Sequence, residues 1–385
     1  MKQSEKVREN VVDGFGMSKK VVCLSFDEEL WKNVHLMKDT GLVPYYFHKI
    51  YGYESVMVGA NIDQYTYLDS YVKGLQMEFV KENTKEARYK YVVDNANEID
   101  LLILVGAYHI NLACAKAYKE RNPRGKIYLQ LDMNSLYGEW LFQAHPELVE
   151  LGDYCDVIAT SCSSTQRMMN LKLPWCVECV TNGYYDGFFG DTIPDFGEKD
   201  NLILTVGRLG TWQKATEVLL EAFAIAYENI CGWKLILIGS VDEGFESYIA
   251  EYYEKCPHLV DIVCFEGEIQ DKAVLVDWYM KAKIFAMPSR MEGGAPNVIS
   301  EALRSGCVMA ITKFDAYTDI IDEGRCGEAG NIDDVESYAD VICRLCNETD
   351  LEKMSKAAYE NAVFRYNYGK TVRILHRLIF GGENE

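Results

Sequence analysis

Short apolar runs alternate with helix-length segments along most of this chain, and that alternation limits the folds open to it. Strands are expected at residues 21–26, 55–59, 101–105, 126–131 and 157–160, and again at 202–206, 234–238, 262–265, 284–287 and 308–311. Helices are expected between them, at residues 111–121, 163–171, 216–227, 245–253, 274–281 and 297–305. Strand–helix alternation favours parallel sheets with right-handed crossovers. The sequence therefore predicts an α/β protein with two doubly wound, Rossmann-like domains that face each other across a cleft.

The expected domain boundary lies within residues 182–198, which are rich in Gly, Pro and Asp and follow neither the strand nor the helix period. We expect a flexible tail over residues 1–16, a first domain over 17–186, a second domain over 187–350 and a C-terminal helix over 351–385. The helical pattern of residues 351–380 favours one long helix that packs back across both domains. A helix lying in a membrane interface is the alternative.

The formal net charge of −20 argues against nucleic-acid binding, because an acidic surface repels polyphosphate. The 13 cysteines are scattered, and the chain opens on polar residues without a signal-peptide pattern. We therefore expect a cytoplasmic protein with reduced thiols and with peripheral membrane contact at most. The pairs Cys176/Cys179 and Cys343/Cys346 lack the turn-flanked spacing of a zinc ribbon.

A first candidate ligand-binding loop, Gly-Arg-Leu-Gly-Thr-Trp-Gln-Lys over residues 207–214, follows the expected strand at 202–206. Ligands of doubly wound sheets collect at the carboxyl ends of strands, where Gly207 lets the backbone turn tightly or approach a ligand. Arg208 offers a planar guanidinium to a diphosphate, and Lys214 adds a second positive charge. Such a loop is more often plain solvated surface, so its interpretation depends on a second motif.

That second motif, over residues 289–303, also follows a strand and runs directly into a helix. Pro296 suits the first helical turn, where a missing N–H costs nothing. Free N–H groups at 294–298 together with the helix dipole favour an anion, and the pair Gly293 and Gly294 allows close approach of a ligand. Glu292 and Glu301 can face one ligand. The alternatives are a capping role for Glu292 and a surface helix position for Glu301.

Residues 202–327 resemble the donor domain of retaining glycosyltransferases of the GT-B fold, in the large family four. The matching segments are LILTVGRLGTWQKATEVLLEAF, WKLILIGS, VCFEGEI, VDWYMKAKIFAMPSRMEGGAPNVISEALRSGC and DIIDEGRCG, and VTNGYYDGFF resembles that family's interdomain linker. The resemblance is specific as a combination and covers the first 150 residues only in outline. It implies that the first domain is the acceptor side and the second the nucleotide-sugar donor side.

The resemblance also assigns roles. Arg208 and Lys214 match the residues that hold the donor diphosphate, Glu301 matches the ribose-binding carboxylate, and Glu292 matches the carboxylate that contacts the transferred sugar. The implied donor-binding set also contains Gly207, Gly293, Gly294, Ala295, Pro296, Asn297 and Val298. Two spacings depart from the family pattern by one extra residue each, between Arg208 and Lys214 and between the two glutamates. The extra residue between Glu292 and Glu301 affects whether Glu292 can contact the sugar.

The first half of the chain contributes fewer candidates. Thr40 and Gly41 lie in the segment Lys38–Leu42, which precedes an expected helix and stands where the family keeps a Gly-rich loop near the donor phosphate. His109 follows the expected strand at 101–105, in a region where the family often has a histidine close to the transferred sugar. A histidine in such a place is a capping or core residue about as often as a catalytic one.

The resemblance implies a retaining hexosyltransferase that moves a sugar from a nucleoside-diphosphate sugar to a glycan or lipid-linked glycan in surface polysaccharide synthesis. No cofactor or divalent metal is expected, because the cationic loop and the helix amides replace one and no Asp-x-Asp cluster lies in a suitable loop. The alternatives are a nucleotide-sugar epimerase and a catalytically inactive protein of the same fold that binds nucleotide sugar or a partner. A phosphorylase would need a pyridoxal-phosphate lysine, for which the sequence offers no convincing site.

Overall fold

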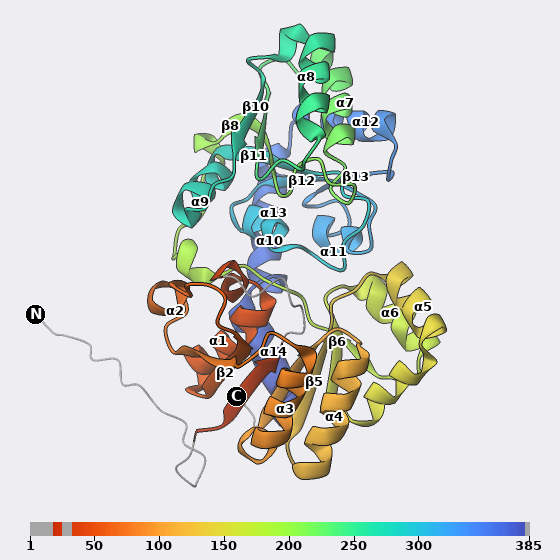
Figure 1. Ribbon diagram of the computed structural model, residues 1–385. Coiled ribbons are helices and arrows are strands. Elements are labelled where there is room, and N and C mark those ends of the chain that lie inside the picture. Colours follow the sequence, from red (N-terminus) through yellow and green to blue (C-terminus); the bar gives the residue numbers. More distant parts are fainter. Residues whose placement is uncertain (1–17, 25–32, 382–385) are drawn as a thin grey trace, which may run out of the picture.

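The computed structural model describes residues 18–24 and 33–381, which form two α/β domains stacked one above the other (Figure 1). The tail expected over residues 1–16 lies outside the described residues. Each domain contains one parallel sheet with helices on both faces, so the predicted pair of doubly wound domains is confirmed.

The first domain contains a seven-stranded sheet in the order β3-β2-β1-β4-β5-β6-β7. Its strands are β1 (Lys20–Leu24), β2 (Glu54–Ala60), β3 (Leu75–Val80), β4 (Leu101–Val105), β5 (Lys126–Leu131), β6 (Val157–Thr160) and β7 (Val177–Cys179). Its helices include η1 (Asn33–Met37), α1 (Asp39–Tyr51), α2 (Tyr67–Ser70), α3 (Lys85–Asn95), α4 (His109–Arg121), α5 (Ser135–Ala144), η3 (Pro146–Asp153) and α6 (Ser163–Lys172).

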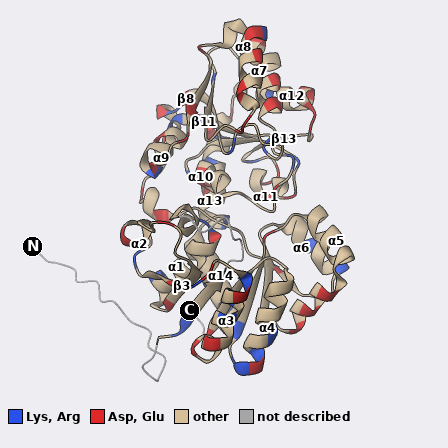
Figure 2. Cartoon of the chain, viewed as in Figure 1, with Lys and Arg blue, Asp and Glu red and all other residues tan. Residues whose placement is uncertain are grey.

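The second domain contains a six-stranded sheet in the order β10-β9-β8-β11-β12-β13. Its strands are β8 (Asp200–Val206), β9 (Lys234–Ile238), β10 (Val263–Gly267), β11 (Ala282–Met287), β12 (Val308–Thr312) and β13 (Gly327–Gly330). Its helices include α7 (Thr216–Ala226), α8 (Phe245–Lys255), α9 (Lys272–Lys281), α10 (Asn297–Arg304), α11 (Tyr317–Ile321) and α12 (Val335–Cys346). Acidic side chains lie on the outer helices α7, α8 and α12 (Figure 2).

The central strands are continuous apolar runs because helices cover both faces of each sheet. Every residue of β6 and β12 is buried, as are the last four residues of β1 and of β9. The carboxyl ends of both sheets point towards the boundary between the domains, where the loops after β5 and β6 contact the loop after β11. The fold therefore brings strand-end loops of both domains together.

Residues 351–380 form two helices rather than the single one that the sequence predicts: α13 (Leu351–Arg365) and α14 (Tyr368–Phe380). The break comes at Asn367, whose side chain accepts from the amide of Lys370 at 3.1 Å and donates to the carboxylate of Asp186 at 2.8 Å. Helix α13 packs against α10 in the second domain, and α14 packs against α1 in the first. The segment crosses both domains, and the break lets each helix follow a different one.

The apolar residues of α14 point into the core of the first domain. Val372, Leu375 and Ile379 are buried together with residues of α1. This face is therefore not open to a lipid surface. Among the described residues, no helix combines the length and the apolar character needed to cross a membrane.

Candidate active site

The loops after β8 and β11 lie side by side and are joined by Arg290. Its backbone N–H donates to the carbonyl of Gln213 at 2.9 Å, and its guanidinium donates to the carbonyl of Trp212 at 2.6 Å. The same guanidinium pairs with Glu217 at 2.6 Å. These three contacts of Arg290 hold the loop after β8 and the start of α7 against the loop after β11.

Lys214 and Glu292, one from each loop, form an ion pair. The other carboxylate oxygen of Glu292 accepts from the side-chain amide of Gln213 at 3.1 Å, and only 7% of Glu292 is exposed. Glu292 thus neutralises Lys214 while no donor is bound.

Arg208 and Gly207 complete the cationic side. The guanidinium of Arg208 donates to Gln213 at 3.0 Å and the side chain stays exposed. A Cβ on Gly207 would meet nothing nearer than the Lys214 side chain at 4.0 Å, so the space above this backbone is open to a ligand. The glycine under real conformational constraint is Gly210, which has a φ of +83° and lies against Phe245.

Helix α10 begins five residues after Glu292, at the end of the same loop. Pro296 is the N-cap residue, with φ −59° and ψ 154°, so it stands one position before the first helical turn in which it was expected. Within the described part of the chain, the amides of Asn297 and Val298 have no recorded hydrogen-bond acceptor. The side chain of Asn297 is held by the hydroxyl of Tyr368 at 3.2 Å and the carbonyl of Met37 at 3.3 Å. The helix start is thus fixed with donors available to an anion.

Glu301 lies just over one turn inside α10 and is 8% exposed. Its nearest cation is Lys272, with the charged atoms 3.8 Å apart. Its Oε2 atom is buried and has no hydrogen-bond partner within 3.5 Å among the described residues. Burial raises the pKa of the Tyr279 hydroxyl well above its usual value, and both the charge of Glu301 and a hydrogen-bonding contact with its carboxylate add to this effect. A ligand hydroxyl would give the Oε2 atom a partner at full hydrogen-bonding distance.

The first domain leaves no room for side chains at Gly293 and Gly294. A Cβ on Gly293 would lie 3.2 Å from the backbone of Met133, after β5, and one on Gly294 would lie 1.9 Å from the hydroxyl of Ser161, after β6. That hydroxyl donates to the carbonyl of Gly293 at 3.1 Å. The two glycines allow the domains to approach each other, which is a packing reason that the sequence motif alone does not reveal.

Thr40 and Gly41 lie inside the first turn of α1, not in a loop before it. A Cβ on Gly41 would lie 2.4 Å from the carbonyl oxygen of Leu36, so the residue allows η1 to fold back onto the helix. Met37, the last residue of η1, contacts the start of α10, because its carbonyl accepts from the side chain of Asn297 at 3.3 Å. The start of α1 therefore lies near the start of α10.

The structure does not bring His109 into this group. His109 is the first residue of α4, and its ring bonds the carboxylate of Glu147 at 2.6 Å and stands 5.0 Å from the ring of His145. Both Glu147 and His145 belong to the first domain.

Two carboxylates that the sequence analysis missed do belong to the site. Asp132 follows β5 directly, and Asp39 begins α1 and accepts from the side chain of Gln130 at 2.5 Å. Desolvation by the surrounding protein, with smaller effects of the charges of Asp39 and Glu292, raises the pKa of Asp132 to about 6, although the residue keeps contact with solvent. Three carboxylates thus converge across the domain boundary. Asp132 follows a strand that was predicted with the correct bounds. The rule that ligand-binding residues follow the carboxyl ends of strands, which indicated Arg208, therefore indicates Asp132 as well.

Asp132→Asn should stabilise the protein at neutral pH by roughly 1 kcal/mol. This value is smaller than the raised pKa of Asp132 alone implies, because solvent screens the charge of an exposed side chain. The folded-state pKa of about 6 lies above the unfolded value near 3.8, so the stabilising contribution of Asp132 is complete below pH 4 and is lost as the pH rises through 6. Thermal melts from pH 4 to 8 should show a stability gain for the asparagine variant that grows up to pH 6. A gain that is independent of pH would contradict this assignment.

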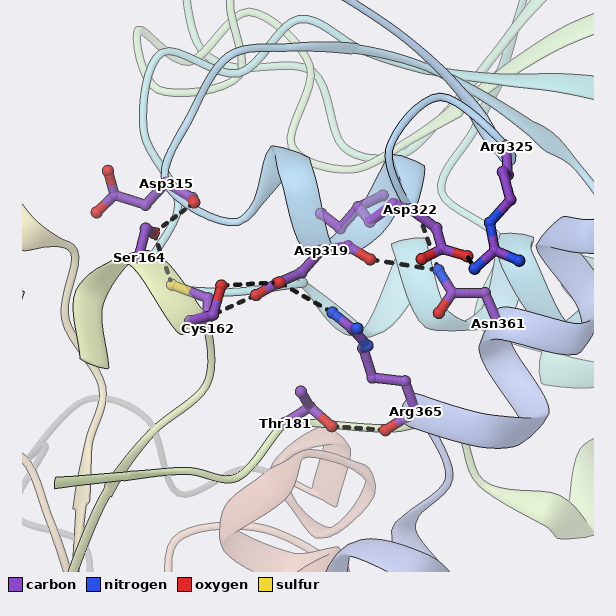
Figure 3. A network of polar contacts seen from close by, with 11 residues as sticks. Cys162, Ser164, Thr181, Asp315, Asp319, Asp322, Arg325, Asn361 and Arg365 are labelled. Atoms are coloured by element: carbon purple, nitrogen blue, oxygen red, sulfur yellow. Dashed lines mark hydrogen bonds and ion pairs between the residues drawn. The ribbon is translucent and has the colours of Figure 1, made fainter. Parts of the chain in front are cut away.

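A network of polar contacts fixes the two domains to each other (Figure 3). The carboxylate of Asp319 in α11 accepts from the amide and the hydroxyl of Ser163, both at 2.8 Å, and pairs with Arg365 at 2.9 Å. The carboxylate of Asp315 accepts from the amide of Ser135 at 2.6 Å. Two carboxylates of the second domain thus meet the positive ends of α6 and α5, where a helix favours an anion. These contacts hold the two domains in the arrangement described above.

Solved structures share this fold along nearly the whole chain. HepE from Anabaena, in complex with UDP and glucose, has a TM-score of 0.69 at 15% identity, covering 93% of this chain and 98% of that one. The sucrose-phosphate synthase of Thermosynechococcus elongatus has a TM-score of 0.68 at 15% identity, covering 94% of this chain and 98% of that one. The architecture is therefore the GT-B fold, two Rossmann-like domains with a site between them.

The family is identified from the second domain. Residues 200–348 match the family model for glycosyl transferases group 1, so the second domain is similar to that family. The phosphatidyl-myo-inositol mannosyltransferase of Mycobacterium leprae is 24% identical over 168 residues, which is 43% of this chain and 42% of that protein. The corresponding protein of Mycolicibacterium smegmatis is 21% identical over 191 residues, 49% of this chain and 48% of that one. The match spans less than half the length of either mannosyltransferase.

Proposed function

We propose that the chain is a retaining glycosyltransferase that moves a hexose-type sugar from a nucleoside-diphosphate sugar to a glycan or lipid-linked glycan, in surface polysaccharide synthesis. The observation that carries the proposal is the meeting of a cationic strand-end loop with the amide-rich start of α10 in the cleft between the domains. The family of the second domain and the UDP complex of HepE support a nucleotide-sugar donor.

The site separates the two charges that sugar transfer creates. Negative charge grows on the departing phosphate, where Arg208, Lys214 and the amide of Asn297 can neutralise it. Positive charge grows at the anomeric carbon, where the carboxylates of Glu292 and Asp132 supply negative potential. The anomeric C–O bond to phosphate breaks while the bond to the acceptor oxygen forms on the same face, and a phosphate oxygen takes the acceptor proton. The reaction needs no metal or cofactor beyond these groups in this proposal.

The acceptor enters from the first domain in this proposal. Trp140 and Tyr137 on α5 are exposed, with ring centroids 5.6 Å apart and planes tilted by 32°. Exposed aromatic rings offer apolar faces to sugars while their polar groups stay hydrated. Helix α5 begins at Ser135, which contacts Asp315 of the second domain, so this aromatic surface borders the domain boundary.

The proposal is tested by incubating the protein with a panel of nucleoside-diphosphate sugars and measuring release of the nucleoside diphosphate. One donor should give slow hydrolysis that a glycan acceptor accelerates, because a closed site limits access of water. Measurable binding of a nucleotide sugar with no release from any donor, in the presence of glycan acceptors, would favour the inactive binding protein. Inversion of the anomeric carbon in the product would refute the retaining mechanism while leaving transfer intact.

A further inference from the structure

Two imidazoles and one carboxylate meet at the start of α4. His109 begins this helix, His145 follows α5, and Glu147 is the second residue of η3. The Oε1 atom of Glu147 lies 2.6 Å from Nε2 of His109 and 3.4 Å from Nδ1 of His145. One nitrogen or oxygen of each side chain lies within 4.8 Å of the corresponding atoms of the other two. Three elements of the first domain therefore direct ligand-type atoms to one point.

These separations suit a metal ion. A tetrahedral ion with bonds of about 2.0–2.2 Å holds its ligand atoms about 3.3–3.6 Å apart. The contact between His145 and Glu147 already has that length. A rotation of His109 would have to lengthen its 2.6 Å contact with Glu147 and set its distance to His145, which is at most 4.8 Å. Imidazole nitrogens favour Zn²⁺, Co²⁺ and Ni²⁺, whereas Mg²⁺ and Ca²⁺ favour oxygen ligands. The donor set therefore selects a transition metal.

The three side chains are also accessible and correctly charged. His109, His145 and Glu147 are 59%, 40% and 46% exposed at the side chain, so an ion can reach them and keep water in its remaining positions. A glutamate side chain is ionised at neutral pH. A carboxylate anion between two imidazoles is the form that binds a divalent cation.

We propose that His109, His145 and Glu147 form a binding site for one divalent transition-metal ion. The ion links the start of α4 to the connection between α5 and η3 and so stabilises this side of the first domain. His109 is then a metal ligand, which differs from the sugar contact that the family resemblance implies. The ion pairs of these three side chains involve none of the donor groups Arg208, Lys214 and Glu301, so the proposal does not depend on the transfer reaction.

Titration of the full chain with Co²⁺ under reducing conditions tests the proposal. Because all 13 cysteines are free thiols, the absorption spectrum must separate ligand types. Nitrogen and oxygen ligation gives visible d–d bands alone, whereas thiolate ligation adds an intense near-ultraviolet charge-transfer band. We expect one equivalent to bind with d–d bands only, and the melting temperature to rise with the Co²⁺ concentration.

Variants of the three ligands complete the test. His109→Ala and His145→Ala should each weaken Co²⁺ binding by about 100-fold or more, since the loss of groups that only orient metal ligands already costs 10–100-fold. Glu147→Gln keeps the shape of the side chain, removes its charge and should weaken binding similarly without unfolding the protein. His258→Ala, at an exposed histidine of the second domain, should leave binding unchanged. Absence of Co²⁺ binding, binding with thiolate bands alone, or unchanged affinity in these ligand variants would overturn the proposal.

Discussion

Replacement of Lys214 by alanine should lower the turnover number for the nucleotide-sugar donor by about 100- to 1000-fold, the effect of removing one prearranged group that stabilises developing charge. Lys214 is the cation closest to the carboxylate of Glu292, and the ion pair joins the two strand-end loops. The side chain lies beside the open space above Gly207. Its positive charge is therefore available to the leaving phosphate while negative charge develops there. Steady-state release of nucleoside diphosphate measures the effect.

This substitution also leaves the largely buried Glu292 without its cation, which should cost roughly 1–3 kcal/mol of stability. The double variant Lys214→Ala, Glu292→Gln removes the unpaired charge and serves as the matched control. It should recover most of the lost thermal stability and remain as slow as the single variant or slower. Recovery of turnover together with stability would mean that Lys214 acts only as a structural partner of Glu292.

Replacement of Glu301 by alanine should weaken nucleoside-diphosphate binding by about 10- to 100-fold, the value of hydrogen bonds to a charged group. One carboxylate oxygen of Glu301 is buried without a partner within 3.5 Å among the described residues, so it has capacity for a ribose hydroxyl. Isothermal titration calorimetry with the nucleoside diphosphate measures the loss. Because the free protein carries an unsatisfied oxygen at this position, we expect its thermal stability to fall little.

Asp340→Ala is the control for Glu301, because Asp340 is an exposed acid on α12 of the same domain. It removes one negative charge without touching the cleft and should leave the affinity unchanged. Equal affinity of the Glu301→Ala variant and the native protein would remove Glu301 from the binding site, and the ribose contact would need another residue.

The strands that the sequence located best are the buried central ones. Residues 101–105, 126–131, 157–160 and 234–238 were predicted with the bounds that the structure has, because these strands are nearly continuous apolar runs. The missed strands β3, β7 and β13 lie at sheet edges. β13 reads Gly-Glu-Ala-Gly and β7 has three residues, so neither carries an apolar pattern. The break between α13 and α14 was missed because helical spacing continues across Asn367.

The positions of the candidate site residues in the fold were predictable where they depend on one domain. Arg208, Lys214 and Glu301 follow strand ends in the second domain, and their grouping follows from the topology of a parallel sheet. The pairing of Glu292 with Lys214 was missed because it depends on side-chain direction across two loops. The convergence of Asp132 with Glu292 depends on how the two domains approach each other, which the spacing of residues along the chain does not encode.

The large surface pocket of the first domain is a poor alternative donor site. It has a volume of about 540 Å³, but Glu147, Glu150, Asp153 and Asp156 line it. The lysines beside this pocket are already paired with its carboxylates, Lys116 with Glu150 and both Lys119 and Lys126 with Asp156. The donor loops instead offer the exposed guanidinium of Arg208 and the helix amides. Charge therefore decides between the two places more clearly than size does.

A crystal structure with a bound nucleoside diphosphate tests the central claim most directly. The diphosphate should lie within hydrogen-bonding distance of the amides of Asn297 and Val298 and contact Lys214 and Arg208, with the ribose hydroxyls on Glu301. A nucleotide bound at any place other than the cleft, or one in the cleft whose phosphates point away from the start of α10, would contradict the account.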